Sequence, residues 1–320
     1  MSTGERMSSL VSVCVCTCKR PQGLARLLET LKRLQLPPGL DVELVVVDND
    51  PEGSGQAIAG PALAAWPWPA RYCIEFQPGV SFARNRCFAE AGGAWIAFVD
   101  DDEWVEADWL LHLVEAAQNS ACDAVIAPVQ SVFEVPPPAW IEKSGAFSRA
   151  AFVTGELIDW RHCASGNALI KRELHARVGG FDVAFGASGG EDTDFFIRCA
   201  TSGARTIWCE EALVHEGVPA YRMTTDWVLR RCMANGRNYA RIVARHLGWA
   251  QAIDTWLRGA TAVLVFGLLA AVGRALGRVD AMRYERRAAM GYGKMTPWRG
   301  SRQGLYGDAG VRRNAPPVNK

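Results

Sequence analysis

Several familiar sequence signatures are missing from this chain, and each absence removes a class of function. No GxGxxG follows the first apolar run and no GxxxxGK[ST] occurs, so neither the dinucleotide-binding turn nor the P-loop is present. No CxxC pair or Cys/His quartet has zinc-site spacing. The 10 cysteines do not resemble a disulfide framework, because Cys14, Cys16 and Cys18 alternate along one expected strand and share a face. We therefore expect reduced thiols in a cytoplasmic protein.

A large excess of charge and a secretory leader are missing as well. The 320 residues include 35 Lys/Arg and 34 Asp/Glu, and this formal net charge of +1 argues against nucleic acid as a partner. Met1–Ser9 is polar, and the apolar run after it is too short for a secretory signal. The charge is uneven, since residues 271–320 contain 11 Lys/Arg and 3 Asp/Glu. This basic C-terminal region favours an anionic surface, such as a membrane, as a partner.

Apolar runs alternate with helical patterns through the first half of the chain. This alternation predicts an α/β fold with a doubly wound, mostly parallel sheet. Strands are expected at Leu10–Thr17, Val42–Val47, Ile74–Gln77, Trp95–Val99 and Ala124–Pro128, and helices at Gly23–Leu36, Ser81–Ala91 and Glu106–Gln118.

The second half of the chain has a less regular pattern. Its expected elements are a short strand at Asn167–Ile170, a helix at Glu191–Ser202, edge strands at Thr206–Cys209 and Ala212–His215, and a helix at Trp227–His246.

One uncharged apolar run, residues 259–273, has three interpretations. It is 15 residues long, whereas a bilayer-spanning helix needs about 20. It can form a buried or inter-subunit helix, insert into a membrane interface with the help of the basic tail, or span a bilayer. The sequence leaves the three alternatives open.

Polar residues follow three of the expected strands, at the positions where doubly wound sheets bind ligands. These are Thr17 to Arg20, Asp48 to Asp50, and Asp100 to Asp102. Three adjacent carboxylates repel one another unless a cation or solvent intervenes, and Mg²⁺ or Mn²⁺ often bind such oxygens together with substrate phosphates. The alternative is a solvated turn before the next helix.

Glu191, Asp192 and His215 are further candidates for chemistry. Glu191 and Asp192 fall in the first turn of an expected helix, where the helix dipole alone also favours acids. In a substrate cleft, such a carboxylate acts as a general base on a hydroxyl. His215 is either a metal ligand or an ordinary hydrogen-bonded side chain.

Six segments in this order resemble family 2 glycosyltransferases, the inverting enzymes with the GT-A fold, and most of all the bacterial glucosyltransferases of succinoglycan-type exopolysaccharide assembly. The resemblance covers residues 10–245. Its segments are VSVCVCTCKRP at 11–21, VVVDNDP at 45–51, GVSFARNRCFAEAGGAWIAFVDDDEW at 79–104, SGNALIKR at 165–172, GGFDVAFGASGGEDTDFFIR at 179–198 and VHEGVP at 214–219.

The resemblance implies a role for individual residues. Asp192 matches the catalytic base, with Glu191 beside it. Asp102 matches the ligand of a Mg²⁺ or Mn²⁺ ion, and His215 matches a position that touches the metal or diphosphate in some relatives. The positions expected to bind the nucleotide-sugar donor are Thr17, Arg20, Asp48, Asn49, Asp50, Arg84, Asp100, Asp101, Gly166 and Asn167.

The resemblance also implies a domain plan and a function. A GT-A domain is expected at 8–225, divided into a nucleotide-binding half (8–128) and an acceptor half (129–225), followed by a helical extension at 226–296 and a basic flexible tail at 297–320. The implied activity is metal-dependent, inverting transfer of a hexose from a UDP-sugar to a glycan or lipid-linked acceptor, at the cytoplasmic face of the inner membrane. The alternatives are a non-catalytic donor-binding subunit and a sugar nucleotidyltransferase.

Overall fold

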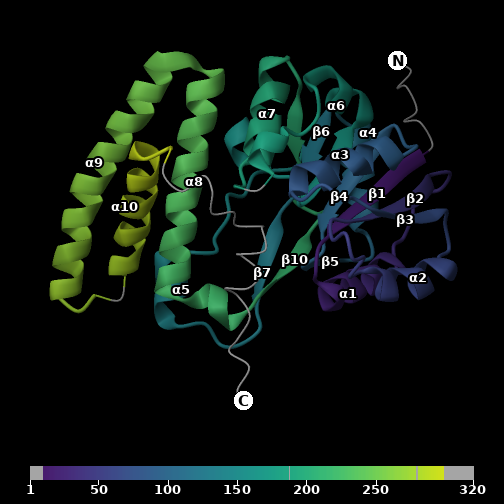
Figure 1. The fold of residues 1–320 in the computed structure, drawn as a ribbon, viewed down its shortest axis with the longest axis horizontal. Coiled ribbons are helices and arrows are strands. Elements are labelled where there is room, and N and C mark those ends of the chain that lie inside the picture. The colour runs from purple at the N-terminus through teal and green to yellow at the C-terminus, as the bar shows by residue number, and fades with distance from the viewer. Residues whose placement is uncertain (1–9, 187, 279, 299–320) are drawn as a thin grey trace. The chain divides into compact units, whose positions relative to one another are not determined.

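The structure is a computed structural model that describes residues 10–298 except 187 and 279 (Figure 1). It divides into two compact units, and each is described by itself. The sheet unit contains the described residues of 1–130, 149–186 and 191–216. The helical unit contains those of 131–148, 187–190 and 217–320. Most of the predicted basic tail lies outside the described residues, and the predicted domain limits stay a prediction.

A seven-stranded sheet forms the centre of the sheet unit. Strands β3, β2, β1 and β4 are parallel to one another, β8 is antiparallel to β4 and β6, and β6 is parallel to β9. The predicted α/β fold with a mostly parallel sheet is therefore confirmed. Across the sheet the strands are β3 (Ala70–Ile74), β2 (Asp41–Asp48), β1 (Leu10–Thr17), β4 (Trp95–Asp100), β8 (Asn167–Lys171), β6 (Ala124–Ile126) and β9 (Thr206–Trp208).

The strand register brings three polar strand ends together. Thr17 at the end of β1 pairs with Asp48 at the end of β2, and Cys16 pairs with Asp100 at the end of β4. Because these strands are parallel, the segments that leave them begin at one edge of the sheet. The site described below is built on this edge.

Helix α1 shows why the sequence folds in this way. Its buried leucines recur at positions 24, 27, 28 and 31 and form one apolar stripe against the strands, while Pro21 occupies the first turn. Gly23 is required for the packing, because a Cβ there would overlap the carbonyl oxygen of Asp101. The helices of the sheet unit are α1 (Pro21–Leu31), α2 (Gln56–Ala64), α3 (Val80–Glu90), α4 (Trp109–Gln118), α6 (Arg172–Val178) and α7 (Glu191–Thr201), with 3₁₀ turns at Trp160–His162 and Val183–Phe185.

A second, three-stranded sheet has the order β5 (Glu103–Val105), β10 (Val214–Val218) and β7 (Val129–Phe133). Strands β5 and β10 are antiparallel, with His215 opposite Trp104. The prediction of an edge strand at Ala212–His215 was therefore wrong, since β10 begins at Val214 and is the middle strand.

Three other boundaries differ from the sequence prediction. The third strand is Ala70–Ile74 rather than Ile74–Gln77, and it is an edge strand whose residues are only partly buried. Helix α1 ends at Leu31, five residues before the predicted end. Helix α4 begins at Trp109, three residues after the predicted start, because residues 106–108 form a turn between β5 and the helix.

The helical unit contains α5 (Ala139–Ser144), α8 (Thr225–His246), α9 (Gly248–Ala275) and α10 (Ala281–Met295), with a 3₁₀ turn at Ala220–Met223. The predicted apolar run 259–273 lies inside α9. This helix is long and apolar enough to cross a membrane by length and composition, and 17% of its most apolar stretch is buried. Length and composition alone do not choose among the three interpretations.

Candidate active site

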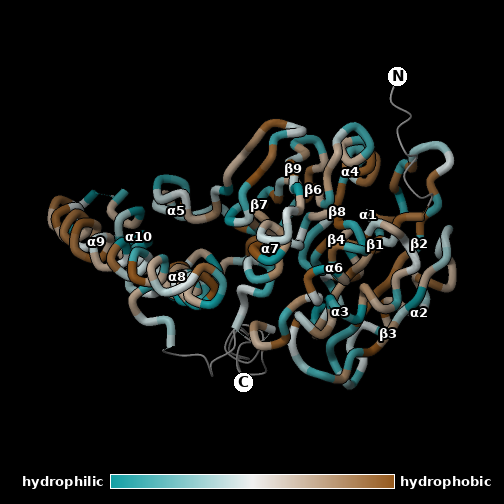
Figure 2. The backbone as a smooth tube through the Cα atoms, turned by 90° about the horizontal axis from the view of Figure 1, so that it is seen from above, coloured by the Kyte–Doolittle hydropathy of each residue, from teal (hydrophilic) through white to brown (hydrophobic). Residues whose placement is uncertain are grey.

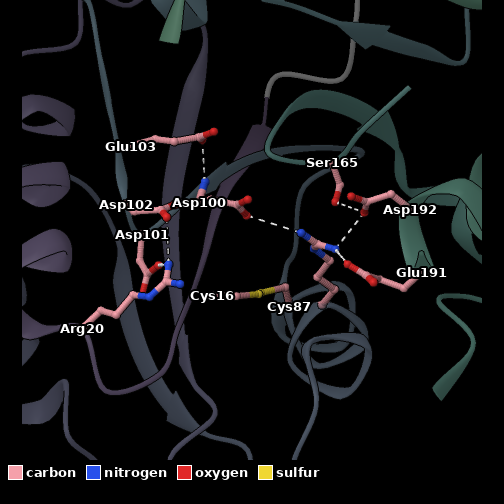
Figure 3. Close-up of polar contacts among 11 residues, drawn as sticks. Cys16, Arg20, Cys87, Asp100, Asp101, Asp102, Glu103, Ser165, Glu191 and Asp192 are labelled. Atoms are coloured by element: carbon pink, nitrogen blue, oxygen red, sulfur yellow. Dashed lines mark hydrogen bonds and ion pairs between the residues drawn. The ribbon is translucent and has the colours of Figure 1, made fainter. Parts of the chain in front are cut away.

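Four acidic residues occupy the end of β4 and the start of β5 (Figure 3). Asp100 is the last residue of β4, and its backbone N–H donates to Glu103 Oε2 at 2.9 Å. Asp101 and Glu103 are buried, whereas the side chains of Asp100 and Asp102 are 42% and 24% exposed. The two partly exposed carboxylates, Asp100 and Asp102, are thus separated by one residue. The buried acids Asp101 and Glu103 follow them in alternation.

The loop after β1 binds two of these carboxylates. Thr17 Oγ1 donates to Asp101 Oδ2 at 2.8 Å. Arg20 Nη1 lies 3.0 Å from Asp101 Oδ1 and 3.0 Å from Asp102 Oδ2. Two predicted donor-binding residues, Thr17 and Arg20, are therefore brought to the aspartate run, where they hold it in place.

Arg84 joins the aspartate run to the predicted base. It projects from α3, and its Nη1 atom lies 2.7 Å from Glu191 Oε1 and 2.7 Å from Asp192 Oδ1. Its Nη2 atom lies 3.4 Å from Asp100 Oδ1. Burial opposes the charge on Arg84, but Asp192, Asp100 and Glu191 outweigh it and raise the arginine pKa well above its usual value. Figure 3 shows the three carboxylates directed toward this one guanidinium.

Asp192 has a second partner that the sequence analysis did not identify. Ser165 Oγ donates a short hydrogen bond to Asp192 Oδ1, the same oxygen that Arg84 contacts. Ser165 immediately precedes Gly166 in the segment quoted above, which is the only signal the sequence offered. Two donors on one oxygen fix the orientation of the Asp192 carboxylate.

Glu191 is the more enclosed of the two neighbouring acids. Its side chain is buried, and Oε2 has no hydrogen-bond partner in the part of the chain that the structure describes. Burial first, and then the charge of Asp192, raise the pKa of Glu191 to about 7, although Arg84 opposes the shift. Glu191 therefore exchanges its proton near neutral pH.

This raised pKa predicts a pH-dependent stability. Between the unfolded value of 4.5 and the folded value of about 7, the folded chain binds more protons at Glu191 than the unfolded chain does. The contribution of Glu191 to stability is therefore complete below its unfolded pKa and is lost as the pH rises through its raised, folded pKa.

Glu191→Gln should remove this part of the pH dependence. We expect the unfolding free energy of the wild type to fall more steeply than that of the variant between about pH 5 and about pH 8, as measured by urea titration. Glu115→Gln, which changes an exposed acid on α4, should leave the wild-type slope intact. Equal slopes in the wild type and Glu191→Gln would contradict the assignment.

Among the described residues, five carboxylates of the site pair with two arginines. Arg20 and Arg84 are the guanidinium groups paired with Asp100, Asp101, Asp102, Glu191 and Asp192. Burial, together with the neighbouring carboxylates, raises the pKa of Asp100 and Glu103 and raises that of Asp101 to about 7. Carboxylate oxygens gathered in this way are the ligand type that a hard divalent cation prefers.

The protein by itself offers an incomplete set of metal ligands. No group of three or more His, Cys, Asp or Glu side chains that could hold a metal occurs within residues 10–298 as described. His215 Nε2 lies 2.8 Å from Glu106 Oε1, its ring stacks on Trp104, and its buried Nδ1 has no hydrogen-bond partner among the described residues. A cation here would share its ligands between Asp102 and bound phosphate, and the ligand role of His215 stays a prediction.

The residues of the turn after β2 bond mainly to the protein. Asp48 Oδ2 accepts from the Gly55 N–H at 2.6 Å and from the Tyr72 hydroxyl at 2.7 Å. Asn49 donates to the carbonyls of Glu75 and Gln77, and Asp50 accepts from the Glu52 N–H. These contacts hold together the loops at the sheet edge, and the predicted donor contacts of Asp48, Asn49 and Asp50 stay predictions.

Gly166 immediately precedes β8, the strand beside β4, and Asn167 is the first residue of that strand. A Cβ on Gly166 would lie 3.0 Å from Asp100 Oδ2 and 3.2 Å from Glu103 Oε1, so this glycine leaves room for the acids. Asn167 is buried, accepts from Trp109 Nε1 at 2.8 Å and donates to the carbonyls of Pro128 and Ala212. Its amide thus joins neighbouring elements, and its donor-binding role stays a prediction.

Comparison with known families gives two matches. Residues 12–179 match the family described as "Glycosyl transferase family 2". Residues 146–223 match the family described as "N-terminal domain of galactosyltransferase". The first match contains the strand ends, Arg84, the aspartate run and Ser165, and the second contains Glu191, Asp192 and His215.

Comparison with individual proteins gives relatives in sequence and several similar folds. The chain is 34% identical to the succinoglycan biosynthesis protein ExoM of Rhizobium meliloti over 254 residues, which is 78% of this chain and 81% of the relative. The mannosyltransferase PcManGT of Pyrobaculum calidifontis, solved with GDP-Man and Mn²⁺, is similar with a TM-score of 0.60 at 20% identity over 91% of this chain and 87% of that one. S. aureus TarS residues 1–349, solved with UDP-GlcNAc, has a TM-score of 0.52 at 16% identity over 90% of this chain and 91% of that one.

Proposed function

The chain belongs to glycosyl transferase family 2, and from this premise we propose that it transfers a hexose from a UDP-sugar, with inversion, to a saccharide hydroxyl. The acceptor we propose is a glycan or lipid-linked saccharide of bacterial polysaccharide biosynthesis. The succinoglycan relative supports this assignment, since it is 34% identical over most of both chains. UDP-GlcNAc bound to the TarS fold supports a uridine nucleotide as the donor.

The observation that carries the proposal is the arrangement around Arg84. Its guanidinium contacts Asp100 on one side and Asp192 on the other, so the strand-end acids and the base candidate belong to one site. A transferase needs both functions close together, because the group that activates the acceptor must act beside the leaving nucleotide.

Asp192 is the residue that activates the acceptor in this proposal. Its carboxylate accepts the proton of the acceptor hydroxyl while that oxygen attacks the anomeric carbon. Ser165 and Arg84 hold one carboxylate oxygen, Oδ1, and leave the other for the acceptor proton. Attack on the face opposite the departing nucleotide inverts the anomeric configuration.

Asp102 is the residue that would hold a Mg²⁺ or Mn²⁺ ion, together with oxygens of the bound diphosphate. When bound, the cation would supply positive charge for the negative charge that develops on the leaving diphosphate. Arg20 lies 3.0 Å from Asp102 Oδ2 and keeps that carboxylate at the strand end. The Mn²⁺ in the PcManGT complex supports this assignment.

Asp102→Asn tests the metal assignment directly. We expect the variant to lose the Mn²⁺-dependent part of its UDP affinity, with a dissociation constant about tenfold to a hundredfold higher in the presence of Mn²⁺. Isothermal titration calorimetry with and without Mn²⁺ measures this difference. Asp159→Asn, which changes an exposed aspartate that is paired with Arg161, is the matched control. An unchanged response to Mn²⁺ in Asp102→Asn would count against the assignment.

A further inference from the structure

Helix α9 buries its small residues and exposes most of its large apolar ones, whereas a helix of a soluble bundle buries its large apolar residues. The residues it buries are small, namely Thr255, Gly259, Ala270 and Gly273. Most of its large apolar residues, together with the C-cap Leu276, are exposed, with exposed fractions from 40% to 79%. We call these residues the α9 face: Trp249, Ile253, Trp256, Leu257, Leu264, Val265, Leu268, Leu269, Val272 and Leu276.

The orientation of the α9 face is fixed by close contacts of glycine residues. A Cβ on Gly259 would lie 2.8 Å from the Gly291 carbonyl oxygen, and one on Gly291 would lie 2.7 Å from the Gly259 carbonyl oxygen. On the other side of α10, Gly293 lies against the Met233 carbonyl of α8 in the same way. Helix α9 therefore cannot turn its large residues inward without breaking these contacts.

The α9 face is a long apolar stripe that the exposed ion pair of Asp254 and Arg258 interrupts near its start. Its members recur with helical spacing from Trp249 to Leu276, and in Figure 2 α9 is coloured as hydrophobic along much of its length. The part from Ile253 to Leu276 is about 35 Å long. Apolar patches of this extent on a soluble chain mark a contact surface.

Basic residues border this face. Residues 248–295 contain seven Lys/Arg and three Asp/Glu, a net charge of +4. Arg258 and Arg274 are exposed on α9, and Arg287 of α10 stacks on Phe266. Exposed tryptophans lie at the start of the helix. Arg258 is paired with Asp254 and Arg274 with Glu285, and the basic residues still outnumber the acidic ones. An exposed apolar surface beside a basic excess fits contact with an anionic bilayer surface.

The helix beside α9 excludes a bilayer-spanning arrangement. Helix α10 packs along α9 and carries Arg283, Glu285, Arg286 and Arg287. If α9 crossed the hydrocarbon region, these charges would enter it as well, at a high free-energy cost. A second copy of the chain on the same face is also disfavoured, because two-fold symmetry would bring identical basic borders together.

We propose that the α9 face lies flat in the interface of a membrane that contains anionic lipid, with the helix parallel to the bilayer surface. The occupant of the face is thus the lipid surface itself. This inference does not depend on the proposed donor, metal or base.

Vesicle flotation of the purified full chain tests the proposal. We expect binding to phosphatidylcholine vesicles that contain phosphatidylglycerol, and at least tenfold weaker binding to phosphatidylcholine alone. The variant Leu264→Gln/Leu268→Gln/Leu276→Gln should bind the anionic vesicles more weakly by a factor of about 100 at least, because three exposed leucines no longer enter the apolar layer. These side chains are exposed, so the variant should keep the wild-type circular dichroism spectrum.

Two controls separate the alternatives. Val153→Gln/Leu157→Gln, which changes equally exposed apolar residues of the sheet unit, should bind within about twofold of the wild type.

An alkaline carbonate wash should release the wild type. Retention after the wash would overturn the in-plane orientation in favour of a span. Absence of vesicle binding, or a wild-type dimer that the triple variant converts to a monomer, would overturn the lipid surface as the occupant. Because no donor is present, these failures leave the transferase proposal intact.

Discussion

Asp192→Asn should lower kcat by about 10²- to 10⁴-fold, the range that a general base contributes, while the affinity for the nucleotide-sugar stays within about twofold. Asparagine keeps the size of the side chain and can still accept from Ser165 and Arg84, but it cannot take a proton. Transfer rates at saturating donor, together with calorimetric donor binding, separate the two effects.

Glu191→Gln is the matched comparison for Asp192→Asn. The substitution changes the adjacent acid in the same helix turn, and Glu191 contacts the same guanidinium, that of Arg84. We expect it to lower kcat by less than tenfold, since Glu191 is the more buried acid and Asp192 is the partly open one. A larger loss in Glu191→Gln than in Asp192→Asn would transfer the role of base to Glu191. A fall in donor affinity in Asp192→Asn equal to its fall in rate would refute the assignment.

Arg84→Met should be the most destabilising single substitution in the site, at about 3 to 5 kcal/mol. It removes the guanidinium that faces Asp100, Glu191 and Asp192, and leaves their carboxylates without that counter-charge. Urea unfolding measures the loss, and the variant should also lose transfer activity because Asp192 is no longer held in place.

Arg86→Met is the matched control for Arg84→Met on the same helix. Arg86 is exposed and pairs with Glu90 four residues later, so its replacement should cost about 1 kcal/mol or less. Similar losses in the two variants would show that the Arg84 cluster has no special role in the fold.

The central sheet was predictable where its strands are buried on both faces. Leu10–Thr17 and Val42–Val47 are continuous apolar runs, and both became strands with nearly those bounds. Strand β3 is a half-buried edge strand without such a run, and β5 has only three residues between acidic positions. Short or edge strands depend on their neighbours in space, and the sequence pattern therefore missed or displaced them.

The sequence predicted which acids belong to the candidate site, and it did not predict the contacts that join them. The family resemblance is confirmed, and it pointed to Asp100, Asp102 and Asp192. The ion pairs of Arg84 join residues 107 and 108 positions apart, which no local pattern reveals. Ser165 was missed because a serine before a glycine is common in loops. Residue type alone also does not distinguish Asp48, whose oxygens bind Gly55 and Tyr72, from an acid that faces a ligand.

The most direct test of the account is the configuration of the product formed with a small alcohol. Methanol, used as the acceptor with an α-linked UDP-hexose, gives a methyl glycoside whose anomeric configuration does not change afterwards and is read by nuclear magnetic resonance. A single displacement assisted by Asp192 predicts the β-linked methyl hexoside, absent in Asp192→Asn. An α-linked product formed by the wild type would contradict the account.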